Sequence, residues 1–329
     1  MHEPTVRAPS DDDQEAILDL VGLGLGVGNV PRTRAFWSWK HLASPFGRSY
    51  ILVAESGGGI VGLRAFMRWT WWSSGQPVFA VRAVDTVTHP DWRGRGIFTR
   101  LTLDMVERVR SEGVAFVFNT PNPRSRPGYL KMGWHRVGRL TPWVQPRRGL
   151  LRRAPARASE SAFSSVGDLI QDPGFDALLR SAMGSGRRLT TRPDAPYLRW
   201  RYAEIPGLRY HAAWRVDGES RAAIVFRLVD RGRTVELRLC EILATPRRES
   251  IRSARRLIDA AARRANAGFV TALAAPGTPE RRAVLGRGFL PAFRRGPVLT
   301  VRPLNPGATP VDPCRSSSWG PAIGSLELF

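Results

Sequence analysis

The most informative stretch of this 329-residue chain reads Val87-Thr88-His89-Pro90-Asp91-Trp92-Arg93-Gly94-Arg95-Gly96-Ile97-Phe98. It starts as the end of an apolar run over 77–88, passes through a segment rich in Gly and Arg, and continues into a helical pattern. In that pattern Ile97, Leu101 and Met105 recur four residues apart, as on one face of an amphipathic helix. The stretch therefore predicts a strand, a tight loop and a helix over 96–111.

A loop of this kind favours the binding of a pyrophosphate. Glycine lets the backbone approach a ligand closely, and a helix N-terminus presents free N–H groups and positive potential. Successive N–H groups in a concave loop bind anions, and Arg93 and Arg95 add charge. The alternative is an ordinary turn that contains glycine, but a second motif further along the chain argues against it.

The segments on either side predict an α/β fold with a mixed sheet flanked by helices. N-cap residues at 10–13 open a helix to about 25, and a glycine-rich turn over 56–59 joins two apolar runs as a hairpin. The expected helices cover 10–25, 33–42 and 123–132, and the expected strands cover 50–55, 60–72, 77–88, 114–119 and 134–144.

The second half of the sequence repeats features of the first. Phe36–His41 resembles Tyr197–Tyr202, Val87–Pro90 resembles Leu243–Pro246, and Leu130–Trp134 resembles Leu285–Phe289, at offsets of 161, 156 and 155 positions. The constant order and spacing predict a duplicated domain. The second copy has Glu249–Ser253 where the first has its glycine loop, so we expect this copy not to bind a cofactor.

These observations predict two domains in tandem. The expected boundaries are 1–146 for the first domain, 147–165 for an Arg/Ala/Ser-rich linker, 166–303 for the degenerate second domain and 304–329 for a C-terminal tail.

A second motif reads Asn119-Thr120-Pro121-Asn122, followed by Gly128-Tyr129-Leu130-Lys131-Met132-Gly133-Trp134. Together the two motifs resemble the GNAT superfamily of acyl-CoA N-acyltransferases. Arg93 and Gly96 match fixed positions of that family's Arg/Gln-x-x-Gly-x-Gly/Ala loop, whereas Phe98 replaces its small third residue. The resemblance covers about 5–145 directly and the second half through the internal repeat.

The resemblance implies how the cofactor, acetyl-CoA, is bound. Val87 and Thr88 would pair with its pantetheine arm, and Asn119 and Asn122 would hydrogen-bond to it. The pyrophosphate would be held by the loop residues Arg93, Gly94, Arg95, Gly96, Ile97, Phe98 and Thr99. The acyl group would then pass directly to an amine, without a covalent enzyme intermediate.

The resemblance also suggests catalytic residues. Tyr129 is positioned to protonate the departing thiolate; the alternative is a tyrosine that packs its helix on the sheet. Asp85 on the central strand is a candidate base, or else a polar residue satisfied by nearby backbone. The C-terminal carboxylate of Phe329 is another candidate base, the alternative being a tail that only links the domains. His89 is interpreted as a loop histidine, and no residues have metal-ligand spacing.

Composition excludes several other classes of protein. The formal net charge of +22 comes from arginines spread along the chain, with only two lysines, which disfavours nucleic acid as the main partner. Two distant cysteines fit a reducing cytoplasm, and no apolar run is long enough to span a membrane. The sequence thus predicts an N-acetyltransferase acting on a small-molecule or peptide amine; the alternative is a non-catalytic acyl-CoA sensor or scaffold. The acceptor and the oligomeric state stay open.

Overall fold

The computed structural model describes residues 3–25, 33–147, 163–182, 186–216, 218–285 and 287–326. The chain forms two compact units, each built from separate stretches of sequence. The first unit combines Met1–Trp71, Gln76–Gly138 and Val298–Ser318, and the second combines Trp72–Gly75, Arg139–Pro297 and Trp319–Phe329.

The first unit is built on a mixed sheet. Its strands, in spatial order among the described residues, are β1 (Thr5–Arg7), β2 (Tyr50–Ser56), β3 (Gly59–Ser73), β4 (Gln76–Thr88), β5 (Phe116–Asn119), β14 (Val298–Pro303) and β6 (His135–Arg139). β4 and β5 are parallel, whereas β1–β2, β2–β3 and β5–β14 are antiparallel. The hairpin expected between 50 and 72 is present, and Gly57 and Gly58 supply the positive φ angles of its turn.

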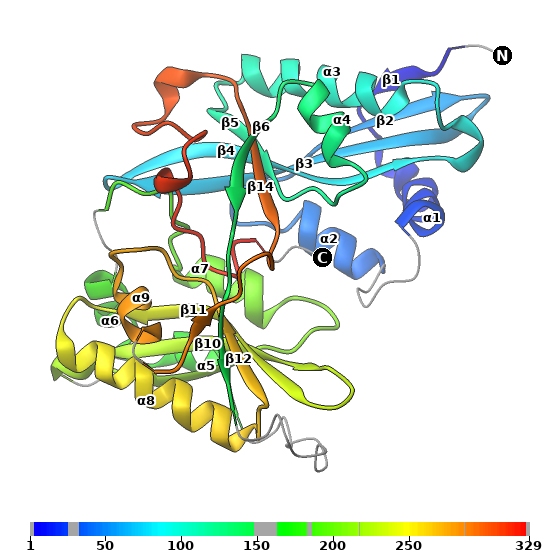
Figure 1. Cartoon of the computed structure of the whole chain (residues 1–329). Coiled ribbons are helices and arrows are strands. Elements are labelled where there is room, and N and C mark those ends of the chain that lie inside the picture. The colour runs from blue at the N-terminus through cyan, green and yellow to red at the C-terminus, as the bar shows by residue number, and fades with distance from the viewer. Residues whose placement is uncertain are drawn as a thin grey trace. The chain divides into compact units, whose positions relative to one another are not determined.

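Helices cover both faces of this sheet (Figure 1). α1 (Gln14–Leu25) and α2 (Arg34–His41) lie on one face, and α3 (Ile97–Ser111) and α4 (Arg126–Lys131) lie on the other. Their apolar stripes form two separate clusters with alternate strand residues, because successive side chains of a strand point to opposite faces. In β2, for example, Leu52 and Ala54 pack towards α3, and Val53 packs towards α1.

The second unit repeats this strand order. Its strands, again in spatial order within the described part of the chain, are β8 (Ser164–Ser165), β9 (His211–Arg215), β10 (Ala222–Asp230), β11 (Val235–Ala244), β12 (Phe269–Ala272), β7 (Trp143–Pro146) and β13 (Leu290–Pro291). β11 and β12 are parallel, as β4 and β5 are in the first unit. The two sheets therefore correspond strand for strand, as expected for a duplication.

Each sheet takes one strand from the other half of the sequence. β14 pairs with β5 of the first sheet, with Thr300 opposite Asn119, and β7 pairs with β12 of the second sheet. This differs from the expected boundaries at 146 and 303, because β7 belongs to the second unit and β14 to the first. The expected strand 134–144 overlaps β7, whereas β14 was not among the expected strands. Local patterns could not assign either strand to its sheet, since the paired residues lie more than 120 positions apart.

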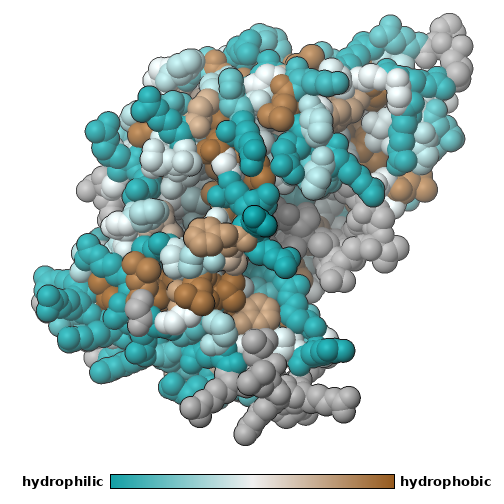
Figure 2. Space-filling view, in the orientation of Figure 1, coloured by the Kyte–Doolittle hydropathy of each residue, from teal (hydrophilic) through white to brown (hydrophobic). Residues whose placement is uncertain are grey.

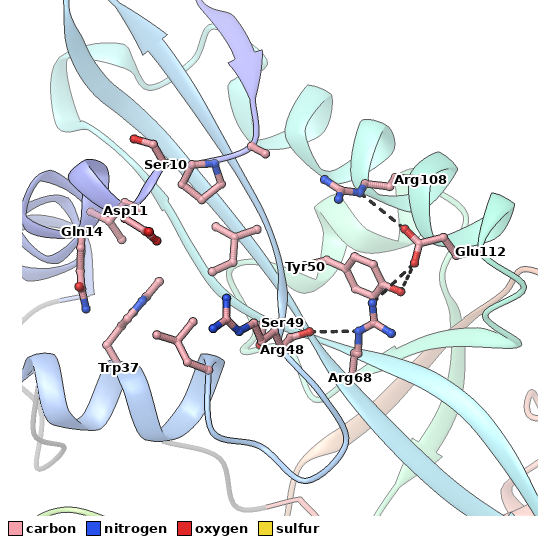
Figure 3. Close-up of a pocket in the computed structure, with 15 residues that line it drawn as sticks. Ser10, Asp11, Gln14, Trp37, Arg48, Ser49, Tyr50, Arg68, Arg108 and Glu112 are labelled. Carbon is pink, nitrogen blue, oxygen red and sulfur yellow. Dashed lines mark hydrogen bonds and ion pairs between the residues drawn. The ribbon is translucent and has the colours of Figure 1, made fainter.

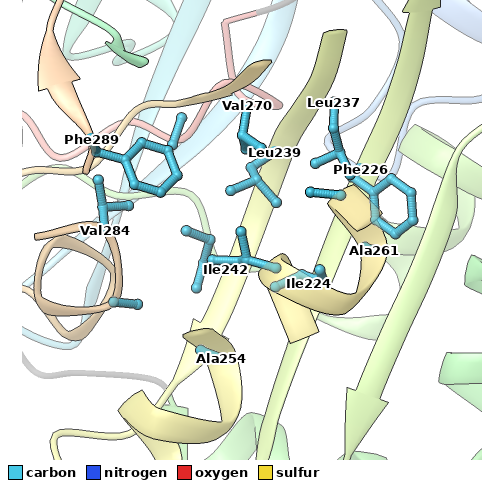
Figure 4. Close-up of a cluster of buried hydrophobic side chains, with 14 of the residues drawn as sticks. Ile224, Phe226, Leu237, Leu239, Ile242, Ala254, Ala261, Val270, Val284 and Phe289 are labelled. Carbon is cyan, nitrogen blue, oxygen red and sulfur yellow. The ribbon is translucent and has the colours of Figure 1, made fainter. Parts of the chain in front are cut away.

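The core of the second unit lies between its sheet and α8 (Arg248–Arg264) (Figure 4). On α8, Ala254, Ile258 and Ala261 pack against the apolar face of β10 and β11. The remaining helices are α5 (Val166–Gln171), α6 (Phe175–Ala182), α7 (Ala195–Leu198), which continues into η5 (Arg199–Ala203), and α9 (Pro279–Val284). Figure 2 shows apolar side chains on the visible surface of this unit. Leu290 and Phe293 of the same unit are 63% and 75% exposed.

The C-terminal segment packs along both units in turn. The Asn305 amide donates to the carbonyls of Arg110 and Val114 at 3.1 and 2.8 Å, within the first unit. In the second unit Trp319 and Leu326 are buried, and the Gly324 N–H donates to the Cys240 carbonyl at 3.1 Å. Much of 306–317 between these contacts is exposed, so the expected tail runs partly over the surface and is packed at the two ends of 304–326.

Candidate functional site

In the first unit, β4 extends beyond its partner β5. Their parallel pairing runs from Ala80–Phe116 to Arg82–Phe118, and β5 ends one residue later, at Asn119. β4 continues to Thr88. Along this extension the edge of β4 that faced β5 has no such partner, so its N–H and C=O groups can pair with an extended ligand.

A backbone irregularity marks the middle of this extension. Val81 and Ala83 pack in the cluster under α3, but Val87, at even spacing from them, packs in the opposite cluster with α1. A regular strand would keep these residues on one face. Asp85 has a φ of 28°, which is rare outside glycine, so the change of face occurs around it.

β4 leads directly into the glycine loop and α3. Gly94 and Gly96 have φ angles of 78° and 76°, and a Cβ built on either would meet no atom within 4 Å. Their requirement is therefore conformational, and the space beside them is open. The first helical bond of α3 runs from Arg100 N–H to the Gly96 carbonyl at 3.0 Å, so the N–H groups of residues 97–99 have no partner within the helix.

The sequence-predicted cations of this loop lie at the surface. Arg93 and Arg95 are both exposed, and the Arg95 guanidinium lies 4.7 Å from the centre of the Trp92 ring. The open glycine loop, the helix N-terminus and the two arginines together form a positive, concave surface. Such a surface can hold a pyrophosphate.

Tyr129 of α4 is buried and has one charged neighbour. Its hydroxyl accepts a hydrogen bond from Nη1 of Arg64 at 2.8 Å, and the Arg64 side chain is fully buried in β3. The Tyr129 ring also contacts Phe98 and Trp134 edge-on, with centroids 5.5 and 5.2 Å apart. Sequence reasoning missed Arg64, although a single arginine within the apolar run 60–67 was a signal for it.

Phe98, the residue that departs from the family loop, is accommodated locally. A Cβ built on Gly128 would lie 3.1 Å from the Phe98 ring, closer than most real contacts. Gly128 therefore gives Phe98 the room to pack against Tyr129 on the neighbouring helix.

Asp85 is held by two residues at the end of α2. Its carboxylate lies 2.7 Å from Lys40 Nζ and 2.8 Å from His41 Nε2, and both of those side chains are buried. Burial opposes the ionisation of Asp85, but the Lys40 charge and the His41 hydrogen bond outweigh it and hold the carboxyl pKa well below its usual range.

His41 links Asp85 to Ser49. Burial lowers the pKa of His41 despite the opposing effect of Asp85, which favours the neutral ring. The neutral tautomer that satisfies both neighbours donates from Nε2 to Asp85 and accepts at Nδ1 from the Ser49 hydroxyl, 2.9 Å away. Sequence analysis did not select Lys40 or His41, because α2 and β4 are brought together only by the fold.

Ser49 also lines a cavity of about 330 Å³ in the first unit (Figure 3). On the other side of this cavity Glu112 accepts a hydrogen bond from Tyr50 and lies 3.7 Å from both Arg68 and Arg108. Burial and the Glu112 hydrogen bond raise the pKa of Tyr50 to about 12. The lining includes neither Tyr129 nor any residue of the loop 93–99.

The side chains of three other predicted residues already have contacts within the protein. Val87 packs its side chain in the core, so only its backbone is available to a ligand. The side-chain oxygen of Asn119 accepts a hydrogen bond from the Thr300 hydroxyl. The side-chain oxygen of Asn122 accepts from the backbone N–H groups of Arg124 and Ser125, both at 2.9 Å. Phe329 lies outside the described residues.

The corresponding loop of the second unit lacks this architecture. Only Thr245–Arg247 separate β11 from α8, and the buried Ser250 hydroxyl accepts a hydrogen bond from the Thr245 N–H. A side chain thus fills the position where the first unit has open glycine backbone.

The carboxylate cluster is duplicated, however. Arg201, Tyr202 and Glu241 stand at the offsets 161, 161 and 156 from Lys40, His41 and Asp85. The Tyr202 hydroxyl donates to Glu241 at 2.6 Å, and burial raises the Glu241 pKa to about 7. In the pairing of β10 with β11 the register shifts beside Glu241, leaving Cys240 as the extra residue, and the Gly324 N–H bonds to its carbonyl.

Two further classes of site are not found in the described part of the chain. No group of three or more His, Cys, Asp or Glu side chains there could hold a metal ion. Across the same residues, no helix combines the length and apolarity needed to cross a membrane.

Comparison with known proteins agrees with this architecture. Residues 5–137 match the acetyltransferase (GNAT) domain family, and no curated protein sequence matches the chain. A GCN5-related N-acetyltransferase from Anabaena variabilis is 14% identical, with a TM-score of 0.65 over 92% of this chain and 73% of that chain. A probable N-acyltransferase of unknown function from Enterococcus faecalis is 12% identical, with a TM-score of 0.66 over 93% and 74%. A tandem GNAT protein from the clavulanic acid biosynthesis pathway is 16% identical, with a TM-score of 0.52 over 94% and 100%.

Proposed function

We propose, from the premise that residues 5–137 form a GNAT acetyltransferase domain within a tandem GNAT-like fold, that this protein transfers an acyl group from acyl-CoA to an amine. Proteins of this family generally use acetyl-CoA, and their acceptors are small molecules or peptides. The observation that carries the proposal is the continuity of β4. Its extension beyond the pairing with β5 leads into the open glycine loop at the N-terminus of α3.

The residues present fit an acyl-CoA donor. The pyrophosphate would sit at the loop Arg93–Thr99, where two left-handed glycines leave open space beside the free N–H groups of α3. The pantetheine amides would pair with the backbone of 83–88, as a further strand pairs with a sheet edge. A bound acetyl-CoA supplies the activated acyl group, and the protein aligns it.

Asn119 and Asn122 would contribute to this site through backbone groups and their side-chain NH2 donors, since their side-chain carbonyls already accept hydrogen bonds. We expect Asn119 and Asn122 to contribute less to acyl-CoA affinity than the glycine loop does. Backbone N–H groups near Asp85 would stabilise the negative charge that develops on the acyl oxygen.

Tyr129 is our candidate general acid. Because its oxygen accepts from Arg64, the phenol retains its own proton for donation. Its burial excludes water from competing for that proton. The amine attacks the thioester directly, so the protein needs no nucleophile of its own.

The general base is a separate proposal. Asp85 would have to give up an ion pair with Lys40 to accept a proton, so we assign it chiefly to holding α2 against β4. The carboxylate of Phe329 is therefore the alternative candidate for the general base in place of Asp85. The compartment we expect is the cytoplasm, because two cysteines as distant in sequence as Cys240 and Cys314 suggest no disulfide framework.

The proposal is tested by two assays on the purified chain. Acetyl-CoA should raise its melting temperature, since a ligand that binds the native state stabilises it. A panel of amino sugars, polyamines and peptides should then identify an amine that stimulates release of CoA thiol. Thermal stabilisation without CoA release for any amine would favour the sensor or scaffold.

Tyr129→Phe tests the acid role. We expect kcat to fall about 10²-fold or more, while acetyl-CoA affinity changes little, because the hydroxyl acts on the leaving group. The measurement is CoA release at saturating substrates, with single-turnover kinetics to show that chemistry limits the rate. An unchanged single-turnover rate would return Tyr129 to a packing role.

A further inference from the structure

Arg64 is a buried cation that the packing of the first unit does not explain. Its side chain is fully buried, and its Nε and Nη2 atoms have no hydrogen-bond partner among the described residues. Its guanidinium carbon lies 4.8 Å from the centre of the Phe66 ring and 5.9 Å from that of Phe98. Aromatic faces offset part of the desolvation of a guanidinium, but an unpaired buried charge still destabilises the folded state.

Within the described part of the chain, the one hydrogen bond of the Arg64 side chain defines the orientation of Tyr129. Nη1 donates to the phenol oxygen, so the oxygen's acceptor site towards Arg64 is occupied and the phenol hydrogen must point elsewhere. Arg64 lies on β3, adjacent to β4, and Phe98 of α3 packs against the same pair of side chains. The unsatisfied cation therefore lies beside the candidate acid and under the helix whose N-terminus forms the glycine loop.

We propose that Arg64 is a positioning residue for Tyr129 and the counter-charge of the phenolate formed during acyl transfer, an inference that rests on the proposed function. The amine nitrogen bonds to the thioester carbon, and the C–S bond breaks with its electron pair remaining on sulfur. The Tyr129 proton moves to that sulfur and gives the CoA thiol. The proton lost by the amine passes to solvent, from which Tyr129 is later reprotonated.

This step gives the Arg64 charge, which has no counter-charge at rest, a negatively charged partner. Before transfer Arg64 faces a neutral phenol; after transfer it faces a phenolate across a 2.8 Å hydrogen bond. An interaction that strengthens as the reaction proceeds accelerates it, whereas one present equally beforehand does not. The stability lost by burying Arg64 is thereby recovered in the reacting state.

A double-mutant cycle tests this coupling. Arg64→Met keeps the length of the side chain and removes its charge, and Arg68→Met, on the same strand but 44% exposed, is the matched control. We expect Arg64→Met to melt at the wild-type temperature or above, because an unpaired charge is removed, yet to lower kcat about 10-fold or more. In a Tyr129→Phe background the same change should alter kcat less than about twofold.

A binding measurement gives a readout other than activity. Calorimetry at pH 8 in two buffers of different ionisation enthalpy reports the protons released when CoA binds, with acetyl-CoA as the ligand that has no thiol. Wild-type protein should release more protons with CoA than with acetyl-CoA, because Arg64 stabilises the single negative charge left on Tyr129 and the bound thiol when this pair loses one proton. This difference should vanish in Arg64→Met and partly return in Arg64→Lys.

The outcomes separate this inference from the proposed function. Equal kcat losses from Arg64→Met with and without Tyr129, or equal proton release by wild type and Arg64→Met, would overturn the role of Arg64 alone. Wild-type protein that neither binds acetyl-CoA nor releases CoA would overturn both. Should Arg64→Met fail to fold, Arg64→Lys and Arg64→Gln complete the same cycle.

Discussion

Two charged residues of the first unit, Asp85 on β4 and Arg64 on the neighbouring β3, have different effects on stability and on the proposed reaction. Asp85 is a carboxylate with buried partners on two sides, and Arg64 is a cation whose neighbour becomes charged only when it reacts. The first arrangement stabilises the resting fold, since each buried charge is matched. The second destabilises it slightly and is retained, in our account, for the reaction.

Replacing Asp85 with Asn should destabilise the protein by about 3–5 kcal/mol at neutral pH, because it leaves Lys40 buried without its counter-charge. The depressed pKa of Asp85 means that its stabilisation is present above the unfolded-state pKa of about 3.9 and is lost as the pH falls further. Urea unfolding at several pH values should therefore show the difference from wild type shrinking below about pH 4.

The control for this prediction is Asp104→Asn, an exposed position on α3. If Asp85→Asn is no more destabilising than that control at pH 7, the Lys40–Asp85–His41 cluster does not stabilise the unit. Retention of full CoA release by a folded Asp85→Asn protein would also exclude Asp85 as the base.

How far the site could be predicted depended on whether its signals were local. Gly94 and Gly96 follow a strand and precede a helical pattern, so sequence alone located the loop and the helix. Whether they bind the cofactor stays a prediction. Arg64, Lys40 and His41 join the site through contacts with residues 44 to 65 positions away, which no local pattern specifies.

Among elements, the exchanged strands have the largest consequence. β14 completes the first sheet between β5 and β6, although in sequence it follows the main segment of the second unit, Arg139–Pro297 (Figure 1). Without β14, β5 would lose its antiparallel partner, and the buried Thr300 and Val301 would be missing from the core. Folding of the first unit thus depends on the last strand of the chain.

A fragment that ends at residue 146 should therefore not fold stably alone. We expect it to lack the near-UV circular dichroism of packed aromatic side chains such as Trp69, Trp71 and Phe118, because the edge of β5 that pairs with β14 would expose apolar surface and free backbone groups. Adding a synthetic peptide of residues 296–318 should restore part of the signal. A cooperative unfolding transition in the fragment alone would contradict this account of β14.

The C-terminal segment offers a second test at this scale. A Cβ at Gly324 would lie 1.6 Å from the Tyr202 hydroxyl oxygen and 2.6 Å from a Glu241 carboxyl oxygen. Gly324→Ala should therefore displace the segment and lower the melting temperature by several degrees, as expected for a loss of about 1–3 kcal/mol by overpacking. Gly307→Ala, which meets no atom within 4 Å, should have little effect.

The tail also shows where sequence reasoning reached its limit. Leu326, near the end of the tail, is buried. Much of 306–317 lies at the surface, whereas the preceding Asn305 side chain bonds to two backbone carbonyls of the first unit. Composition reports what a segment can bury but not which partners it finds.

The whole molecule consists of one duplicated fold whose two copies have diverged. Both copies retain the strand order, the parallel central pair and a carboxylate held by the preceding helix. The first copy keeps open glycine backbone before its long helix. In the second, Ser250 replaces that opening and Gly324 bonds to the extra residue of the central strand. We therefore expect one acyl-CoA site per chain, in the first unit.

The most direct test of this claim is a calorimetric titration of acetyl-CoA into the full chain and into Gly96→Val. We predict one site per chain in the wild type and an affinity at least about 10-fold weaker in the variant, because a β-branched residue is strained at a φ of 76° and fills the space beside the helix N-terminus. Gly22→Ala, which meets no atom within 4 Å, is the control and should bind as the wild type does. Two equivalent sites per chain, or unchanged affinity in a folded Gly96→Val protein, would contradict the account.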